Sequence, residues 1–174
     1  WGYEGMIKLT VIVTTVLLAV LLLSRPSFAG EGSLIPMEDF FRNPEKSGFR
    51  ISPDGTRISW RAPWERRLNI FVQKIGEEEA TRVTSATERD ILGYFWSGND
   101  RILYLQDSGG DENYHLFAVD AGGSGAKDLT PFEGVRVTIV DPLEEIDDEV
   151  LIGMNRRDPR VFDVFRLNID TGEL

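Results

Sequence analysis

A serine flanked by glycines is the first segment of the sequence that invites a catalytic interpretation. Gly122-Gly123-Ser124-Gly125-Ala126 approaches Gly-x-Ser-x-Gly, in which a sharp turn between a strand and a helix exposes a nucleophilic serine. The last position is Ala126, both flanking segments have strand character, and the single histidine, His115, precedes the serine. Hydrolases with that motif carry their triad in the order Ser, Asp, His. We therefore interpret residues 122–126 as a hairpin turn and predict no catalytic residue here.

His115 is a candidate general base or metal ligand, because an imidazole changes charge near physiological pH. The sequence has no second histidine and no cysteine to complete a common zinc site. Alternation along an extended strand places His115 on the same face as Phe117 and Val119. We interpret it as a packed structural histidine.

Two acidic runs offer oxygen ligands of the kind that calcium prefers. The first contains Asp107, Asp111 and Glu112, and the second extends from Asp141 to Glu149. Neither has the D-x-[DN]-x-[DN]-G spacing of a dedicated calcium loop, and solvated hairpin acids account for both equally well. We expect no metal and no cofactor.

Two arginine pairs, Arg66-Arg67 and Arg156-Arg157, are the candidates for binding carboxylates. A guanidinium group is planar and holds a carboxylate through two parallel hydrogen bonds. Ordinary surface charge is the alternative interpretation, since exposed ion pairs are common and individually weak. The choice between the two depends on the elements that position these pairs.

The composition limits the possible partners. Nineteen Lys and Arg residues stand against 29 Asp and Glu, and the net charge of −10 opposes binding to nucleic acid. Hydrophobic residues make up 41% of the 174 residues, which is enough for one ordinary core. The absence of cysteine excludes disulfides and thiolate chemistry.

Residues 1–29 read as five upstream residues followed by a signal peptide. Met6-Ile7-Lys8 is a short basic start, residues 9–23 are uncharged and mostly aliphatic, and Ser27-Phe28-Ala29 supplies the small residues of a signal-peptidase site. A membrane-spanning helix needs about 20 apolar residues, more than this run provides. We predict cleavage before Gly30 and an exported protein, periplasmic or extracellular, without membrane contact after cleavage; an uncleaved anchor is the alternative.

The remaining chain consists of short apolar runs bounded by Gly, Pro, Asp or Asn. After a lead-in over residues 30–48, these runs predict strands at 49–52, 57–61, 68–75 and 80–84. Ser52-Pro53-Asp54-Gly55 has the composition of a tight turn between the first two strands. The result is a four-stranded antiparallel unit.

The same unit recurs along the chain. The third strands align on Phe71, Phe117 and Phe165, with spacings of 46 (117 − 71) and 48 (165 − 117) residues. A four-stranded unit repeated every 40–50 residues or so is typical of β-propeller blades, whereas a β-sandwich would not require a fixed period. We predict an all-β fold, a β-propeller with four-stranded antiparallel blades at about 49–90, 91–136 and 137–174. Because propellers close with about four to eight blades, we expect a fragment that stops within its third blade.

Two stretches carry a more specific resemblance. Residues 40–46 (FFRNPEK) lead into 51–55 (ISPDG), and residues 109–120 (GGDENYHLFAVD) precede 128–132 (DLTPF). Together they resemble the N-terminal propeller of bacterial prolyl oligopeptidase-family serine peptidases, of the dipeptidyl aminopeptidase and acylaminoacyl-peptidase type. The resemblance covers essentially all of residues 34–174.

The resemblance implies that an α/β-hydrolase domain with a Ser-Asp-His triad follows beyond Leu174 and cleaves short peptides. It also implies that the propeller restricts access by size and helps to shape the substrate pocket. The activity would belong to the parent protein, so no catalytic residue is assigned in this chain. The alternative function is a non-enzymatic periplasmic propeller that scaffolds protein partners.

The loops between second and third strands should emerge together at one end of a propeller. They are expected at residues 65–67, 108–112 and 156–160, and the first and last contain the arginine pairs. We expect this end to face the hydrolase domain or peptide substrates, with Arg66, Arg67, Arg156 and Arg157 pairing with carboxylates across the gap.

Overall fold

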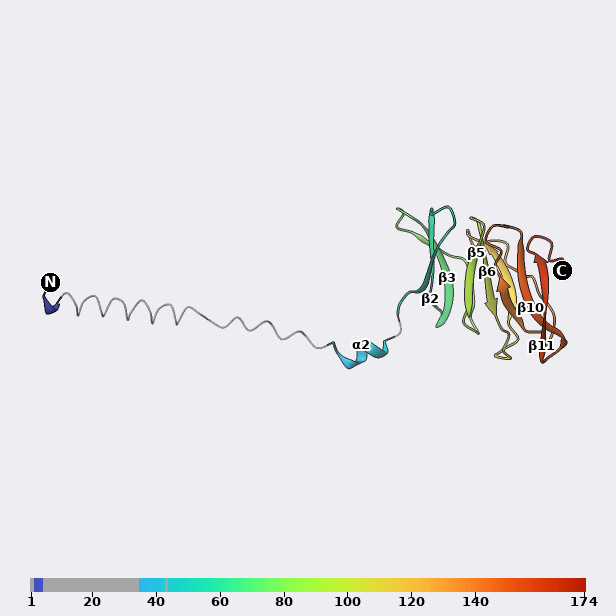
Figure 1. Ribbon diagram of the computed structural model, residues 1–174, viewed down its shortest axis with the longest axis horizontal. Helices are drawn as coiled ribbons and strands as arrows, with labels where there is room; N and C mark the ends of the chain where they lie inside the picture. Colours follow the sequence, from blue (N-terminus) through green and yellow to red (C-terminus); the bar gives the residue numbers. More distant parts are fainter. Residues whose placement is uncertain (1, 5–34, 43) are drawn as a thin grey trace. The chain divides into compact units, whose positions relative to one another are not determined.

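The computed structural model describes residues 2–4, 35–42 and 44–174, and the chain divides into two compact units, Trp1–Asn43 and Pro44–Leu174 (Figure 1). The signal peptide and its cleavage site lie outside the described residues. In the first unit, helix α2 (Met37–Phe41) follows Pro36, and the acids of its first turn complement the positive end of the helix dipole. No helix among the described residues is long and apolar enough to span a membrane.

The second unit begins with an antiparallel sheet in the order β1-β2-β3-β4. Its strands are β1 (Ser47–Ile51), β2 (Arg57–Trp64), β3 (Arg67–Lys74) and β4 (Ala80–Arg82). The expected turn between β1 and β2 is present: Asp54 Oδ1 accepts hydrogen bonds from the Ser52 hydroxyl at 2.6 Å and the Thr56 amide at 3.0 Å. Gly55 supplies the positive φ of +71° that this turn requires. These hydrogen bonds, the one from Ser52 above all, lower the pKa of Asp54.

Two further sheets repeat this arrangement. The second has the order β5-β6-β7-β8, with β5 (Gly93–Ser97), β6 (Arg101–Gln106), β7 (His115–Asp120) and β8 (Lys127–Asp128). The third has the order β11-β10-β9, with β9 (Val137–Asp141), β10 (Glu149–Asp158) and β11 (Val161–Asn168). All the pairings are antiparallel between strands that follow one another along the chain, as in a blade.

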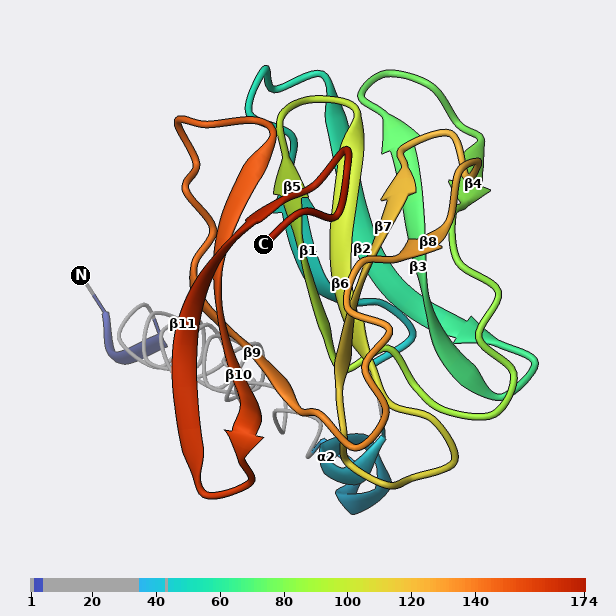
Figure 2. The same ribbon diagram turned by 90° about the vertical axis from the view of Figure 1, so that its right-hand side faces the viewer.

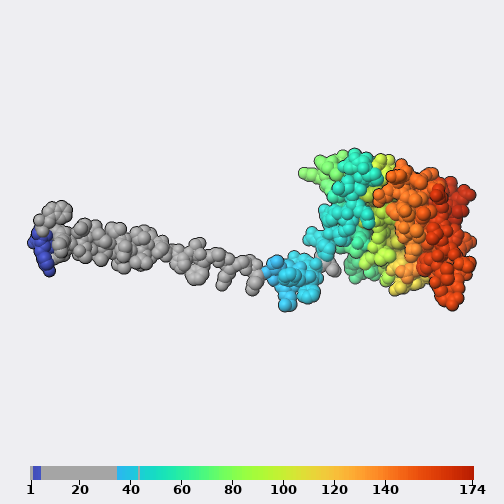
Figure 3. All heavy atoms as spheres, viewed as in Figure 1, coloured from blue at the N-terminus to red at the C-terminus, as the bar shows by residue number. Residues whose placement is uncertain are grey.

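The sheets pack face to face, and the middle sheet is covered on both faces. Strand alternation sends Ile102 and Tyr104 into a core shared with the first sheet, and Leu103 into a core shared with the third. Each core is built from residues of two neighbouring sheets. The three sheets consequently follow one another as successive bands of the second unit (Figure 3).

Turn contacts align neighbouring sheets at one end of the strands. Arg57 Nη1 lies 2.8 Å from Asp100 Oδ1, and the Ser97 hydroxyl donates to the Asp147 carbonyl at 2.7 Å. The β1–β2, β5–β6 and β9–β10 turns therefore lie together. We call this the acidic end, because it carries Asp100, Asp147, Asp148 and Asp170. The β2–β3, β6–β7 and β10–β11 turns lie at the opposite end, which we call the arginine end (Figure 2).

This architecture confirms the predicted fold class: stacked antiparallel sheets of a β-propeller, four-stranded in the first two blades and three-stranded in the third. One detail was expected differently. Residues 156–158 continue β10, and the connection to β11 is the turn Pro159-Arg160, not a loop over 156–160. The run from Asn155 to Asp158 has no apolar alternation, so only the pairing with β11 identifies it as strand.

Candidate functional site

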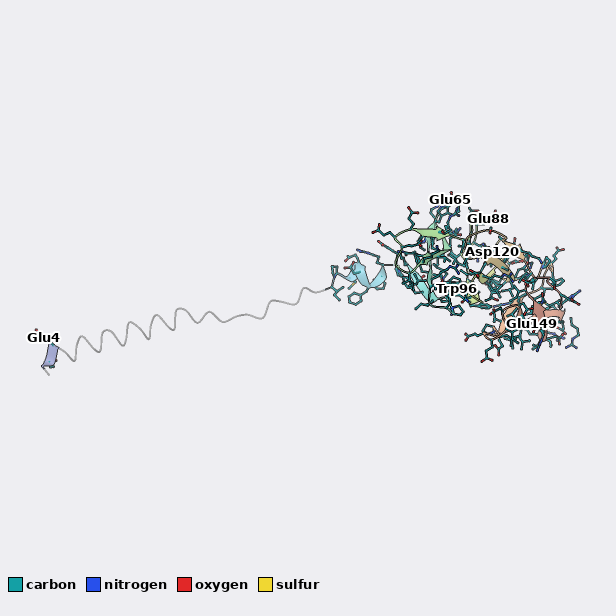
Figure 4. The ribbon with its side chains drawn as sticks, turned by 90° about the horizontal axis from the view of Figure 1, so that it is seen from above. Glu4, Glu65, Glu88, Trp96, Asp120 and Glu149 are labelled. Carbon is teal, nitrogen blue, oxygen red and sulfur yellow. The ribbon has the colours of Figure 1, made fainter. Side chains whose placement is uncertain are left out.

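The first arginine pair lies at the tip of the β2–β3 hairpin. Trp64 and Arg67 are the last paired residues, and Glu65 and Arg66 form the two-residue turn between them, with φ of +48° and +66°. Positive φ at both positions is the pattern of a type I′ turn, which usually takes Asn and Gly. Glu65 is labelled in Figure 4. Arg66, the next residue, is exposed, and Arg67 is half-buried as the first residue of β3.

A buried amide holds this unfavourable turn in place. Asn69 is fully buried, and its side-chain nitrogen donates to the carbonyls of Arg67 at 3.1 Å and Ala86 at 2.9 Å. Its side-chain oxygen accepts from the Thr84 hydroxyl at 2.9 Å and the Ala86 amide at 2.7 Å. The clamp ties the base of the hairpin to the chain leaving β4 and so fixes the backbone from which the tip projects.

The second arginine pair is already partly occupied. Arg157 binds Asp163 of the neighbouring strand through two parallel hydrogen bonds, Nε to Oδ2 at 2.9 Å and Nη2 to Oδ1 at 2.8 Å. This contact raises the pKa of Arg157 and lowers that of Asp163. Arg156 points elsewhere, with its guanidinium 4.5 Å from the centroid of the Phe132 ring.

The two arginine pairs share an end of the molecule but do not meet. No hydrogen bond or ion pair joins them within residues 44–174, and the second sheet stands between their hairpins. The β6–β7 loop of that sheet carries a partly buried ion pair, because Asp107, with a side chain only 2% exposed, lies 3.1 Å from Arg89 Nε. Across the described arginine end, Arg66, Arg67 and Arg156 have no carboxylate partner.

A cleft at the acidic end was not identified from the sequence. It has a volume of about 410 Å³ and is lined by the end of β1, by β5 and by the β9–β10 turn. Ile51, Phe95, Trp96 and Leu143 give it apolar walls, and Glu144 and Glu145 lie at its edge. The acidic run 141–149 pointed to this turn, but the apolar partners come from two other sheets and only the fold brings them together.

The other sequence candidates have structural partners. His115 Nδ1 lies 2.7 Å from Asp128 Oδ2 and its ring stacks on Phe117, so it joins β7 to β8. The Ser124 hydroxyl donates to Asp120 within the turn that follows β7. Among the described residues, no three His, Cys, Asp or Glu side chains are grouped closely enough to hold a metal ion.

The fold and these turns define the class of protein: part of a β-propeller whose blades each form from one continuous segment. No family model matches the chain. It is 40% identical over 141 residues to dipeptidyl aminopeptidase BIII of Pseudoxanthomonas mexicana, a match that covers 80% of this chain and 20% of that protein. It is 33% identical over 153 residues to dipeptidyl peptidase family member 6 of Caenorhabditis elegans, covering 81% and 20%. The chain thus spans about one fifth of the length of these relatives.

Solved structures agree on the fold. Oligopeptidase B from Leishmania major matches with a TM-score of 0.55 at 13% identity, covering 72% of this chain and 18% of that one. TolB from Acinetobacter baumannii matches with a TM-score of 0.52 at 15% identity, covering 74% and 31%. At such identities the likeness concerns the fold alone. The two sequence matches confirm the predicted resemblance to dipeptidyl aminopeptidases, and the solved structures confirm the β-propeller fold.

Proposed function

We propose that this chain is the non-catalytic propeller part of an exported serine peptidase that hydrolyses short peptides. The observation that carries the proposal is the 40% identity, over 80% of the chain, to a dipeptidyl aminopeptidase. The propeller restricts access by size and shapes the substrate pocket. The cleft of about 410 Å³ beside the first strands of the blades supports this role, since it offers apolar walls and charged edges to a peptide.

The arginine end is the proposed contact with the hydrolase domain or with peptide substrates. Arg66, Arg67 and Arg156 support this role, because they have no carboxylate partner within the described residues and a carboxylate is their natural ligand. Arg157 would have to exchange Asp163 for a new partner. The predicted signal peptide supports export to the periplasm or beyond, and the charge of −10 speaks against nucleic acid as a partner.

The alternative is a periplasmic scaffold without enzyme activity. Its support is the likeness of fold to TolB, at 15% identity. The sequence matches to dipeptidyl peptidases, at 40% and 33% identity, favour the peptidase.

The reading frame beyond Leu174 separates the two functions. The peptidase proposal expects further blades, then a Gly-x-Ser-x-Gly elbow followed by Asp and His in that order. The protein made from the whole frame should react with a fluorophosphonate probe for active serines, and residues 30–174 alone should not. A stop codon soon after propeller closure, or a whole protein inert to the probe, would eliminate the peptidase.

A further inference from the structure

Strand direction places both ends of a complete blade at the arginine end. The β1–β2 turn lies at the acidic end, so β1 begins, at Ser47, at the arginine end. Three antiparallel reversals later, β4 runs back toward that end, and the connector after it passes the base of the β2–β3 hairpin, where the Ile91 amide donates to the Leu68 carbonyl at 3.1 Å. The second blade repeats this course, since the Val137 amide at the start of β9 donates to the Tyr114 carbonyl at 2.8 Å.

A four-stranded blade therefore receives the chain and releases it at the same end. A domain joined to the chain before β1, or after a complete blade, is connected at the arginine end, and short connections keep such a domain close by. Of the two partners proposed for this end, a hydrolase domain and a peptide, the strand topology favours the domain.

Three exposed groups of charge follow one another across the arginine end. Arg66 lies on the first sheet, Asp111 and Glu112 on the second, and Arg156 on the third. None of these four side chains takes part in a salt bridge within residues 44–174. The order of the sheets thus sets an order of charge, which is positive, negative and positive.

The acidic loop in the middle is held in a defined shape. At its base, Asp107, with a side chain only 2% exposed, lies 3.1 Å from Arg89 Nε, and the Gln106 side-chain nitrogen donates to the Arg89 carbonyl at 3.1 Å. At its tip, the Asp111 carboxylate accepts from the backbone and side-chain nitrogens of Asn113 at 3.0 and 3.1 Å. These hydrogen bonds, the backbone one above all, lower the pKa of Asp111, so it is negatively charged at neutral pH.

The arginines on either side are positioned by their neighbours as well. The Asn69 clamp holds the backbone of the first hairpin, and the Arg156 guanidinium stacks 4.5 Å from the centroid of the Phe132 ring. Stacking uses the face of a guanidinium and leaves the N–H groups at its edge free for a carboxylate. Groups held in place before contact lose less conformational freedom on binding, which favours one defined orientation of the partner.

The spread of these charges is too wide for a short peptide. Stacked sheets lie about 10 Å apart, so tips on three successive sheets extend over about 20 Å. A dipeptide spans only about 7 Å. A folded surface is needed to meet all three groups of charge at once.

We propose that the arginine end docks a folded domain whose surface is acidic opposite Arg66 and Arg156 and basic opposite Asp111 and Glu112. The inference rests on the proposed function, from which it takes the hydrolase domain as the partner. The three groups of charge set the rotational position of that domain over the blades, because a shift by one blade would bring like charges opposite each other.

Photo-cross-linking in the protein made from the whole frame tests this docking. Arg66→Cys, Glu112→Cys and Arg156→Cys each place one thiol in a chain without cysteine; the thiol is labelled with a benzophenone maleimide, and cross-linked peptides are identified by mass spectrometry. We expect all three to cross-link outside the blades, next to acidic residues from the two arginine positions and next to basic residues from Glu112→Cys. The matched controls, Ile75→Cys and Glu145→Cys, lie exposed at the acidic end and should give no such cross-links.

Equal or greater cross-linking from the two controls, or none from any variant, would overturn the docking. Acidic residues cross-linked to Glu112→Cys, or basic residues to the two arginine positions, would overturn the order of charge. A fluorophosphonate probe on the same samples reports separately on the peptidase. A protein that reacts with the probe but does not cross-link from the arginine end contradicts the docking alone, and an inert protein that does cross-link there contradicts the peptidase alone.

Discussion

At the scale of single residues, the two four-stranded blades share one threonine hydrogen bond to the third strand but differ in the side chain beside it. Thr84 and Thr130 occupy equivalent positions, and their hydroxyls accept from the amides of Ile70 and Leu116, both at 2.9 Å. The residue preceding each amide is Asn69 in the first blade and His115 in the second. Asn69 binds Thr84 and Ala86, whereas His115 binds Asp128. The blade thus retains a clamp on its outer strand while the residue that makes it varies.

Asn69→Ala tests how much the first clamp contributes. The substitution leaves the Thr84 hydroxyl and both backbone groups of Ala86 without their partner in a buried position. We expect a loss of about 2–4 kcal/mol in the free energy of unfolding, measured by urea denaturation. The control Asn113→Ala removes an amide that bonds only Asp111 at the surface and should cost less than about 0.5 kcal/mol. Equal losses in the two variants would contradict the clamp.

At the scale of elements, the third strands of the three sheets differ in how they are covered. β3 and β7 are each paired with a fourth strand, β4 and β8, while β11 is an edge strand in the described sheet. β11 also carries exposed apolar side chains, with Val164 61% and Phe162 41% exposed. A long apolar edge strand presents unpaired backbone groups that another chain can join.

Val164→Lys should therefore reduce self-association of this chain. A charge in the middle of an edge strand opposes pairing with a second copy. We expect the weight-average mass in sedimentation equilibrium to rise less with concentration than for the wild type. The control Ile75→Lys adds the same charge at an apolar residue, 57% exposed, in the turn after β3. If Ile75→Lys lowers the mass as much, net charge and not the β11 edge is responsible.

The sequence predicted the elements better than the sites. The repeat of 46 to 48 residues and the Ser52–Gly55 turn can both be read directly from the sequence. Together they were enough to predict the blades and the order of the strands within each. The extension of β10 through Arg156 and Arg157 was missed, because only the pairing with β11 defines that end of the strand. The cleft at the acidic end was missed because its walls come from β1, β5 and the β9–β10 turn of three different sheets, which no local pattern encodes.

At the scale of the whole molecule, charge is distributed unevenly between the two ends. The turns of the acidic end bring together Asp100, Asp147, Asp148 and Asp170, of which Asp100 and Asp170 pair with Arg57 and Arg101. The opposite end presents Arg66, Arg67 and Arg156 on its two outer hairpins, with Asp111 and Glu112 on the loop between them. Fields of this kind act mainly on the rate and orientation of association. The contact that we propose with a hydrolase domain or peptides uses the arginines without a carboxylate partner at that end, Arg66, Arg67 and Arg156.

Charge reversal in the peptidase encoded by the whole frame tests that contact. Arg66→Glu with Arg67→Glu should raise KM for a dipeptide substrate or weaken domain docking by about three- to tenfold, more at low salt, because partially exposed pairs contribute about 0.2–1 kcal/mol each. Arg156→Glu with Arg157→Glu should act in the same direction and also lose the Asp163 pair. Arg166→Glu, which breaks a surface pair with Glu149 on β10 and β11, is the control. Peptide kinetics and docking that match the control would contradict the contact.

The middle sheet, covered on both faces by its neighbours, has a consequence for how such a molecule can grow. Its two faces pack on the first and third sheets, which have the same antiparallel arrangement as the middle sheet itself. Equivalent residues, such as Phe71 and Phe117, are separated by one full repeat. An in-frame duplication or deletion of one period rejoins surfaces that already fit, so a gene can change its number of blades without inventing a new interface.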